Sequence, residues 1–136
     1  MYTSEGKKIV STDKAPKAIG PYSQAIRTEN YVFTAGQIGL EPSTMEIVKG
    51  GIEAETQQAL TNLKHILEST DSGLNFVVKT LVFLQDMNDF AKMNAVYSEF
   101  FPENPPARST VQVAALPKGA QVEIECVALI SPTRGD

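Results

Sequence analysis

The fold is decided by the segment PPARSTVQV at residues 105–113 and by VEIECVA at residues 122–128. Side-chain type alternates along both segments, and this two-residue period is typical of β-strands. Arg108 and Thr110 share one face of the first strand, whereas Glu123 lies on the polar face of the second. If the two strands pair as a hairpin, Arg108 and Glu123 lie on one side of the sheet, around a partly apolar patch.

A guanidinium and a carboxylate on one face permit two interpretations. Arg108 could clamp a carboxylate ligand with its planar fork of N–H donors. Glu123, beside apolar residues, could have a raised pKa and act as an acid or base. Alternatively, the two side chains form a structural ion pair on a solvated face. The strand pattern does not fix the pairing register, so both interpretations stay open at this point.

Length and composition indicate one globular domain that spans residues 1–136. The chain has 42% hydrophobic and 21% charged residues, which is ordinary for a globular protein, and no low-complexity linker divides it. Its single cysteine, Cys126, excludes an intramolecular disulfide and fits a reducing compartment.

Charge and the N-terminal sequence indicate which classes of partner and which cellular location to expect. The net charge of −4 and the pI near 5.0 argue against a broad nucleic-acid surface, so we do not expect nucleic acid as a partner. No apolar run is long enough to cross a membrane, and residues 1–8 lack the apolar stretch of a signal peptide. We therefore expect a cytoplasmic protein with no membrane partner; a mitochondrial location stays open if a leader has been removed.

The remaining elements alternate between strands and helices. Apolar residues recur at helical spacing across residues 52–69, and a second helix begins at Asp86 or Asn88 and runs to about Phe101. This order predicts an α+β fold with a single mixed, mostly antiparallel sheet and two helices on one face. Further strands are expected at residues 8–11, 23–28, 31–37 and 76–84, and a frayed polar tail at residues 131–136.

Two helices cover only one face of such a sheet. The other face carries Phe83 or Leu84 together with Val127 and Leu129, and contiguous exposed apolar surface is rare in monomers. We therefore expect a homo-oligomer that buries this face between subunits and places the arginine and the glutamate in or near the interface.

Three further residues are candidates for a pocket. Gly20-Pro21 restricts the backbone before Tyr22, so its phenol has a defined direction, either into a pocket or over the turn. Gly36, in the small-residue segment 35–39, lets a ligand or another backbone approach closely. Asn94 falls within the apolar stripe of the second helix. It needs a partner, either a backbone group of the sheet or a group in a pocket.

The only histidine does not suggest a catalytic role. His65 falls on the polar side of the first helix with Gln58, Asn62 and Glu68, which is typical of a solvated residue. Because Cys126 is on another element, the sequence has the parts of neither a His-ligated metal site nor a Cys–His nucleophile.

Several segments resemble, in order, the reactive intermediate deaminase family (Rid, also called YjgF). They extend from about residue 9 to residue 130, nearly the whole chain, and the C-terminal block is the family's most specific signature. The matching segments are AIGPYSQA at 18–25, GQI at 36–38, VKT at 78–80, DF at 89–90, NA at 94–95, PARS at 106–109, LPKGA at 116–120 and VEIE at 122–125.

This resemblance implies a chorismate-mutase-like α+β fold that assembles as a homotrimer with three clefts between subunits. It also implies hydrolysis of 2-aminoacrylate and related enamine or imine intermediates to 2-keto acids and ammonia, without a metal or organic cofactor. By motif position, Arg108 would clamp the substrate carboxylate and Glu123 would position or activate the attacking water. Tyr22, the Gly36 backbone and Asn94 would line and orient the pocket.

One residue departs from the family pattern. Thr110 stands where many bacterial members have cysteine, so it keeps a small polar group in the substrate site but no thiol.

Two other functions compete with imine hydrolysis. Some eukaryotic relatives are described as translation inhibitors with ribonuclease activity. The third interpretation is a non-catalytic or chaperone-like trimer that only binds 2-keto acids.

Overall fold

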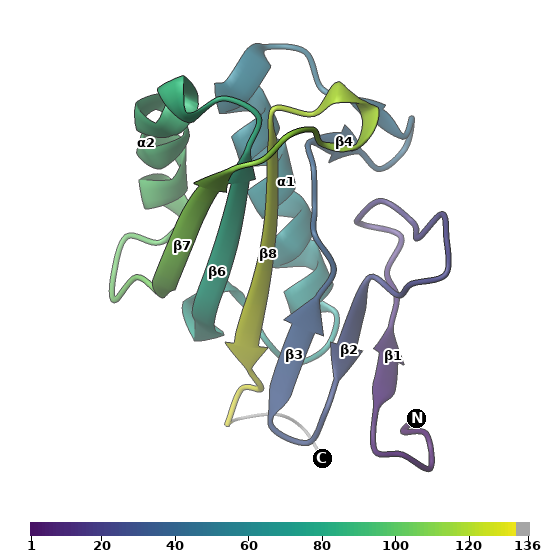
Figure 1. Cartoon of the computed structure of the whole chain (residues 1–136). Coiled ribbons are helices and arrows are strands. Elements are labelled where there is room, and N and C mark those ends of the chain that lie inside the picture. The colour runs from purple at the N-terminus through teal and green to yellow at the C-terminus, as the bar shows by residue number, and fades with distance from the viewer. Residues whose placement is uncertain (133–136) are drawn as a thin grey trace.

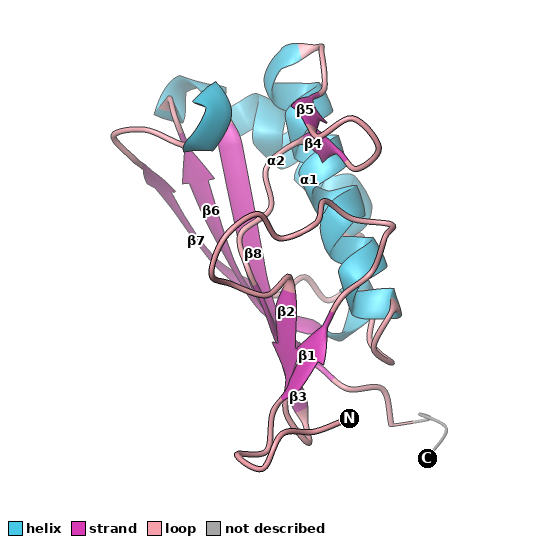
Figure 2. Ribbon diagram, turned by 90° about the vertical axis from the view of Figure 1, so that its right-hand side faces the viewer, coloured by secondary structure: helices cyan, strands magenta, loops and turns pink. Residues whose placement is uncertain are grey.

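A six-stranded sheet forms one layer of the fold and two helices form the other in the computed structural model, which describes residues 1–132 (Figures 1 and 2). Residues 133–136, the end of the predicted tail, lie outside the described part. The predicted α+β class, the mixed sheet and the helices on one face are confirmed. In sheet order the strands are β1 (Lys8–Val10), β2 (Ala25–Arg27), β3 (Tyr31–Thr34), β8 (Val122–Leu129), β6 (Val77–Leu84) and β7 (Ala107–Gln112).

The expected hairpin between the two defining strands is wrong. Strand β6 lies between them, parallel to β7 and antiparallel to β8. Thr80 of β6 pairs with both Arg108 and Cys126, so these three side chains share the helix-covered face, while Glu123 pairs with Phe83 on the other face. A parallel pair needs a crossover, and helix α2 supplies it. The sequence pattern showed which residues alternate but not which strands are neighbours.

The core lies between the sheet and the helices α1 (Gly51–Glu68) and α2 (Phe90–Phe100) (Figure 2). The apolar stripe predicted for the first helix is buried along its length. Asn62, placed on the polar side by the sequence pattern, is instead fully buried. Its amide donates to the carbonyls of Ile38 (3.3 Å) and Leu40 (3.0 Å), which satisfies the amide and fixes the chain after β3. No helix in residues 1–132 is long and apolar enough to cross a membrane.

The face of the sheet opposite the helices is open and largely apolar; in Figure 1 it faces the viewer. Phe33 and Leu129 are 45% and 40% exposed there, next to the half-buried Phe83 and Val127. Leu84, the alternative to Phe83, lies in the core. The sequence therefore identified the apolar character of this face correctly, and its burial between subunits stays a prediction.

A separate two-stranded hairpin, β4 (Leu40–Glu41) and β5 (Glu46–Ile47), lies beside the start of α1 and was not predicted. It packs on a small second core made of Ile38, Leu40 and Ala120. This hairpin forms one wall of the pocket described next.

Candidate active site

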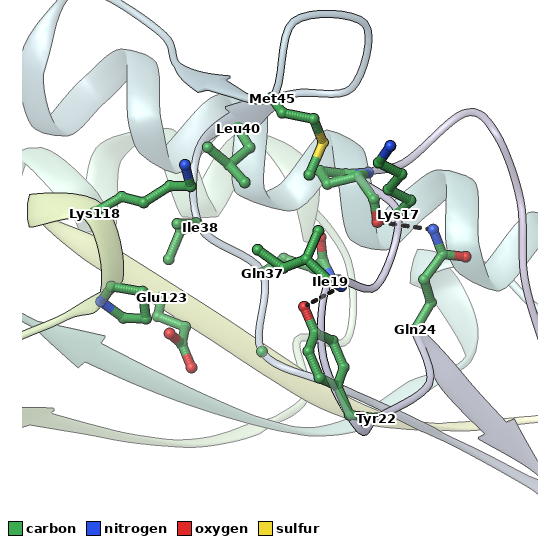
Figure 3. A pocket seen from close by; sticks show the side chains of 13 residues that line it. Lys17, Ile19, Tyr22, Gln24, Gln37, Ile38, Leu40, Met45, Lys118 and Glu123 are labelled. Carbon is green, nitrogen blue, oxygen red and sulfur yellow. Dashed lines mark hydrogen bonds between the residues drawn. The ribbon is translucent and has the colours of Figure 1, made fainter.

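A pocket of about 140 Å³ lies at the start of β8, bounded by the loop before β2, the chain after β3 and the β4–β5 hairpin (Figure 3). Three of the predicted site residues, Tyr22, Gly36 and Glu123, line it together. Tyr22 and Gly36 lie in the first third of the sequence, whereas Glu123 lies near its end. We call this the Glu123 pocket.

Gly36 is in direct contact with the catalytic candidate Glu123. A Cβ at this position would lie 2.7 Å from Cδ of Glu123 and closer still to Oε2, so no residue other than glycine fits without displacing the carboxylate. Two backbone hydrogen bonds between Gln37 and Ile124, of 2.8 and 2.9 Å, hold the two segments at this distance. The sequence predicted that a ligand or another backbone approaches Gly36, whereas in the structure the approaching group is the Glu123 side chain.

The Glu123 carboxyl group is half-buried, and its pKa is raised. Burial, which disfavours the charged form, is the larger cause, and the nearby negative charge of Glu125 adds to it. Within residues 1–132 Glu123 makes no salt bridge. A carboxyl group of this kind exchanges protons closer to neutral pH than an ordinary glutamate does, as an acid–base catalyst requires.

The loop that carries Tyr22 is held at the pocket by residues that the sequence did not single out. The Tyr22 hydroxyl accepts a hydrogen bond from the backbone N–H of Ile19 at 3.4 Å, and Figure 3 shows the phenol at the pocket wall. Gln24, 3% exposed, donates to the carbonyls of Ala15 and Pro16 and accepts from the N–H of Thr12. The side chain of Gln24 therefore fixes the course of the loop. Nothing local in the sequence signals these long-range bonds.

Arg108, Asn94 and Thr110 form a second cluster on β7 and α2, which we call the Arg108 cluster. Nη1 of Arg108 donates to Oδ1 of Asn94 at 2.7 Å, so the partner of Asn94 is Arg108 and not the sheet backbone. The guanidinium carbon lies 5.4 Å and 4.7 Å from the ring centroids of Phe90 and Tyr97. These contacts orient the guanidinium and leave other N–H donors for a ligand.

Thr110 adds an unpaired hydroxyl to this cluster. Its Oγ1 is buried and has no hydrogen-bond partner among the described residues. It faces the same side of the sheet as Arg108, two residues away along β7. A buried hydroxyl without a partner is costly, and a bound polar ligand would satisfy it.

Within one chain the two clusters do not meet. Arg108 lies on the helix-covered side of the edge strand β7, and Glu123 lies on the open side of β8. The expectation that they share one face is therefore wrong, and so is the alternative of a structural ion pair, because residues 1–132 hold no Arg108–Glu123 salt bridge. In the observed register Arg108 pairs with Thr80 of β6 and Glu123 pairs with Phe83, and residues 80 and 83 lie on opposite faces of that strand.

The described residues contain no group of three or more histidine, cysteine or acidic side chains able to hold a metal ion. Burial raises the pKa of the Cys126 thiol to about 12, which makes it a poor nucleophile at neutral pH. His65 uses Nδ1 to bond the carbonyl of Lys14 at 3.0 Å on the surface of α1, away from both clusters.

Comparisons with known proteins agree on one family. The model of the Endoribonuclease L-PSP family matches residues 12–130. A RutC family protein of Pyrococcus abyssi is 54% identical over 122 residues, which cover 90% of this chain and 96% of that protein. The 2-iminobutanoate/2-iminopropanoate deaminase of Mus musculus is 49% identical over 126 residues, 93% of each chain.

A solved structure shows the same fold. The crystal structure of E. coli TdcF with bound serine matches with a TM-score of 0.87 at 42% identity, covering 91% of this chain and 99% of that chain. The sequence and structural matches together span nearly all of the described elements. This protein therefore belongs to the Endoribonuclease L-PSP family, the YjgF/Rid family that its C-terminal block resembles.

Proposed function

We propose that the protein hydrolyses enamine and imine intermediates, such as 2-aminoacrylate and 2-iminobutanoate, to 2-keto acids and ammonia. It does so as a homotrimer in which the Glu123 pocket of one copy meets the Arg108 cluster of the next. The observation that carries the proposal is a guanidinium with N–H donors left after its bond to Asn94, together with a half-buried carboxyl group of raised pKa, in a chain 49% identical to a 2-iminobutanoate/2-iminopropanoate deaminase.

The surfaces around both clusters support assembly. The Phe90 ring, which contacts the Arg108 guanidinium, is 37% exposed, and Val111, which pairs with Phe83 on the open face of the sheet, is 44% exposed. The open face of the sheet adds the exposed Phe33 and Leu129. Burying these surfaces against a second copy removes them from water and encloses the reaction between two subunits.

The chemistry needs one anchor and one proton carrier. Protonation of the enamine carbon gives the iminium form, whose carboxylate is bound by the Arg108 fork. Glu123 takes a proton from water as the water oxygen forms a bond to the imine carbon. It then delivers this proton to the amine nitrogen, the C–N bond breaks, ammonia leaves, and loss of the hydroxyl proton gives the keto acid.

The other site residues orient these two groups. Asn94 holds the guanidinium through its 2.7 Å bond, and the Gly36 backbone supports the carboxylate. Tyr22 at the pocket wall and Thr110 beside Arg108 contribute hydroxyls that can bond the substrate or the water. None of these steps requires a metal, because protonation already makes the imine carbon electrophilic.

Release of keto acid tests the proposal. 2-Aminoacrylate is generated by a dehydratase from serine, and the rate at which pyruvate appears is compared with and without the protein. Acceleration supports the proposal, and an unchanged rate rejects it. RNA cleavage, the activity in the family's name, is assayed in parallel; the net charge of −4 opposes binding of a polyanion.

Replacing Gly36 with alanine is expected to lower kcat/KM about 100-fold, because the new Cβ displaces the Glu123 carboxylate and small displacements of catalytic groups have effects of this size. Steady-state assays with 2-iminobutanoate measure the loss. Gly20→Ala is the matched control, because its Cβ meets the Tyr22 ring at an ordinary 3.4 Å. Full activity in Gly36→Ala would contradict this contact.

The rate should fall on acidification through the raised pKa of Glu123, because only the deprotonated carboxylate accepts a proton from water. Glu125→Gln removes a negative charge that raises this pKa, so the acidic limb of kcat/KM should move to lower pH. Burial is the larger cause and remains, so the shift is partial. Glu99→Gln, on the exposed surface of α2, should leave the limb in place.

A further inference from the structure

Met45 adopts a backbone conformation that residues other than glycine rarely adopt. Its φ is 60°, at the end of the loop that joins β4 and β5, where its N–H bonds the carbonyl of Glu41 at 2.8 Å. Glycine adopts the left-handed region at no steric cost, whereas methionine pays a penalty. A strained residue that persists at a pocket is a reason to ask what its side chain does.

The side chain of Met45 extends into the Glu123 pocket. It is half-buried and packs against the small core of Ile38, Leu40 and Ala120. Figure 3 shows its thioether directed inward between Leu40 and Lys17, on the side of the pocket away from Glu123. Methionine at this position therefore occupies space that glycine would leave open.

The position of the reacting carbon determines which part of the substrate faces this wall of the pocket. In the proposed function the imine carbon lies at Glu123 and its carboxylate points to the guanidinium of another copy. The remaining substituent, the substrate side chain, then extends into the rest of the pocket. Away from Glu123 this part is formed largely by the apolar side chains Ile19, Ile38, Leu40 and Met45.

We propose that Met45 limits the length of the substrate side chain, so that the site prefers imino acids with short apolar side chains to those with longer branched ones. This inference rests on the proposed function. Removing Met45 side-chain atoms should open the far end of the pocket. The gain should appear only for the longer substrate, since a short side chain does not reach this wall.

The test compares two imines formed in place by an L-amino-acid oxidase, one from 2-aminobutyrate and one from leucine. For Met45→Gly, the ratio of kcat/KM for the leucine-derived imine to that for 2-iminobutanoate should rise about tenfold, the effect of relieving a clash of one or two carbon atoms. Met45→Ala should raise the ratio in the same direction, and it serves if the glycine variant does not fold.

Asn104→Gly is the matched control. Asn104 also has a left-handed φ, of 48°, but it lies in the exposed loop before β7 and does not line the Glu123 pocket. Its substitution relieves the same backbone conformation and should leave the ratio unchanged. An unchanged ratio in folded Met45→Gly and Met45→Ala overturns the inference while the deaminase proposal stands. If the wild type accelerates hydrolysis of neither imine, the proposed function fails and this inference with it.

Discussion

Glu123→Gln should lower kcat/KM for 2-iminobutanoate about 1,000-fold, since loss of a general base removes a factor of this order. Glutamine has the shape of glutamate and still fits against Gly36, but it cannot take a proton from water. The affinity for 2-ketobutanoate, measured by calorimetry, should change little because the anchor is elsewhere. If the Glu123→Gln variant hydrolyses the imine at the wild-type rate, Glu123 is not the general base.

The same substitution should not weaken the fold. Because the folded-state pKa of Glu123 is raised, its contribution to stability is fully present below the unfolded-state pKa and is lost as pH rises through the folded-state pKa. Above the folded-state pKa the ionised carboxylate therefore disfavours the folded state. Glu123→Gln should melt at an equal or higher temperature than the wild type at pH 7, and a large drop would show that the lost activity is structural.

Arg108→Ala should lower kcat/KM by a factor of about 1,000 as well, because two charge-assisted hydrogen bonds to the substrate carboxylate are lost. Arg108→Lys should recover only part of the loss, since an ammonium group keeps the charge without the fork. Unlike Glu123→Gln, this variant should also lose affinity for 2-ketobutanoate. Lys92→Ala, which removes an exposed positive charge from α2, is the control for a general charge effect.

Mixing the two inactive variants tests whether the site is shared between copies. A subunit with Arg108→Ala keeps Glu123, and a subunit with Glu123→Gln keeps Arg108. If the two variants are co-expressed and assemble at random into the proposed trimer, about one quarter of the interfaces combine an intact residue from each side, so about one quarter of the wild-type activity should return. No recovery in trimers that contain both variants would mean that both residues act within one chain.

The sequence predicted the elements better than their arrangement. Local periodicity predicted a helix at 52–69 and strands at 105–113 and 122–128, and the structure has them at Gly51–Glu68, Ala107–Gln112 and Val122–Leu129, because burial on one side leaves a repeating pattern. It could not show that β6 separates β7 from β8, since strand neighbours depend on contacts distant in sequence. The resulting error put Arg108 and Glu123 on one face.

The sequence indicated a site residue only where the residue type itself required an explanation at that position. Gly36 stood out because small residues mark close approach, and Asn94 because an amide in an apolar stripe needs a partner. Gln24 and Met45 gave no such signal. The role of Gln24 lies in bonds to a loop eight to twelve residues away, and Met45 is unusual only in its backbone angle.

The exposed apolar face of the sheet also bears on the life of a newly made chain. A chain that has not joined the proposed assembly presents Phe33 and Leu129 to its surroundings, and such surfaces attract chaperones or begin aggregation. Substitutions that loosen this face would then lower the amount of protein more than the turnover of each molecule. Their phenotype would depend on expression level and quality control.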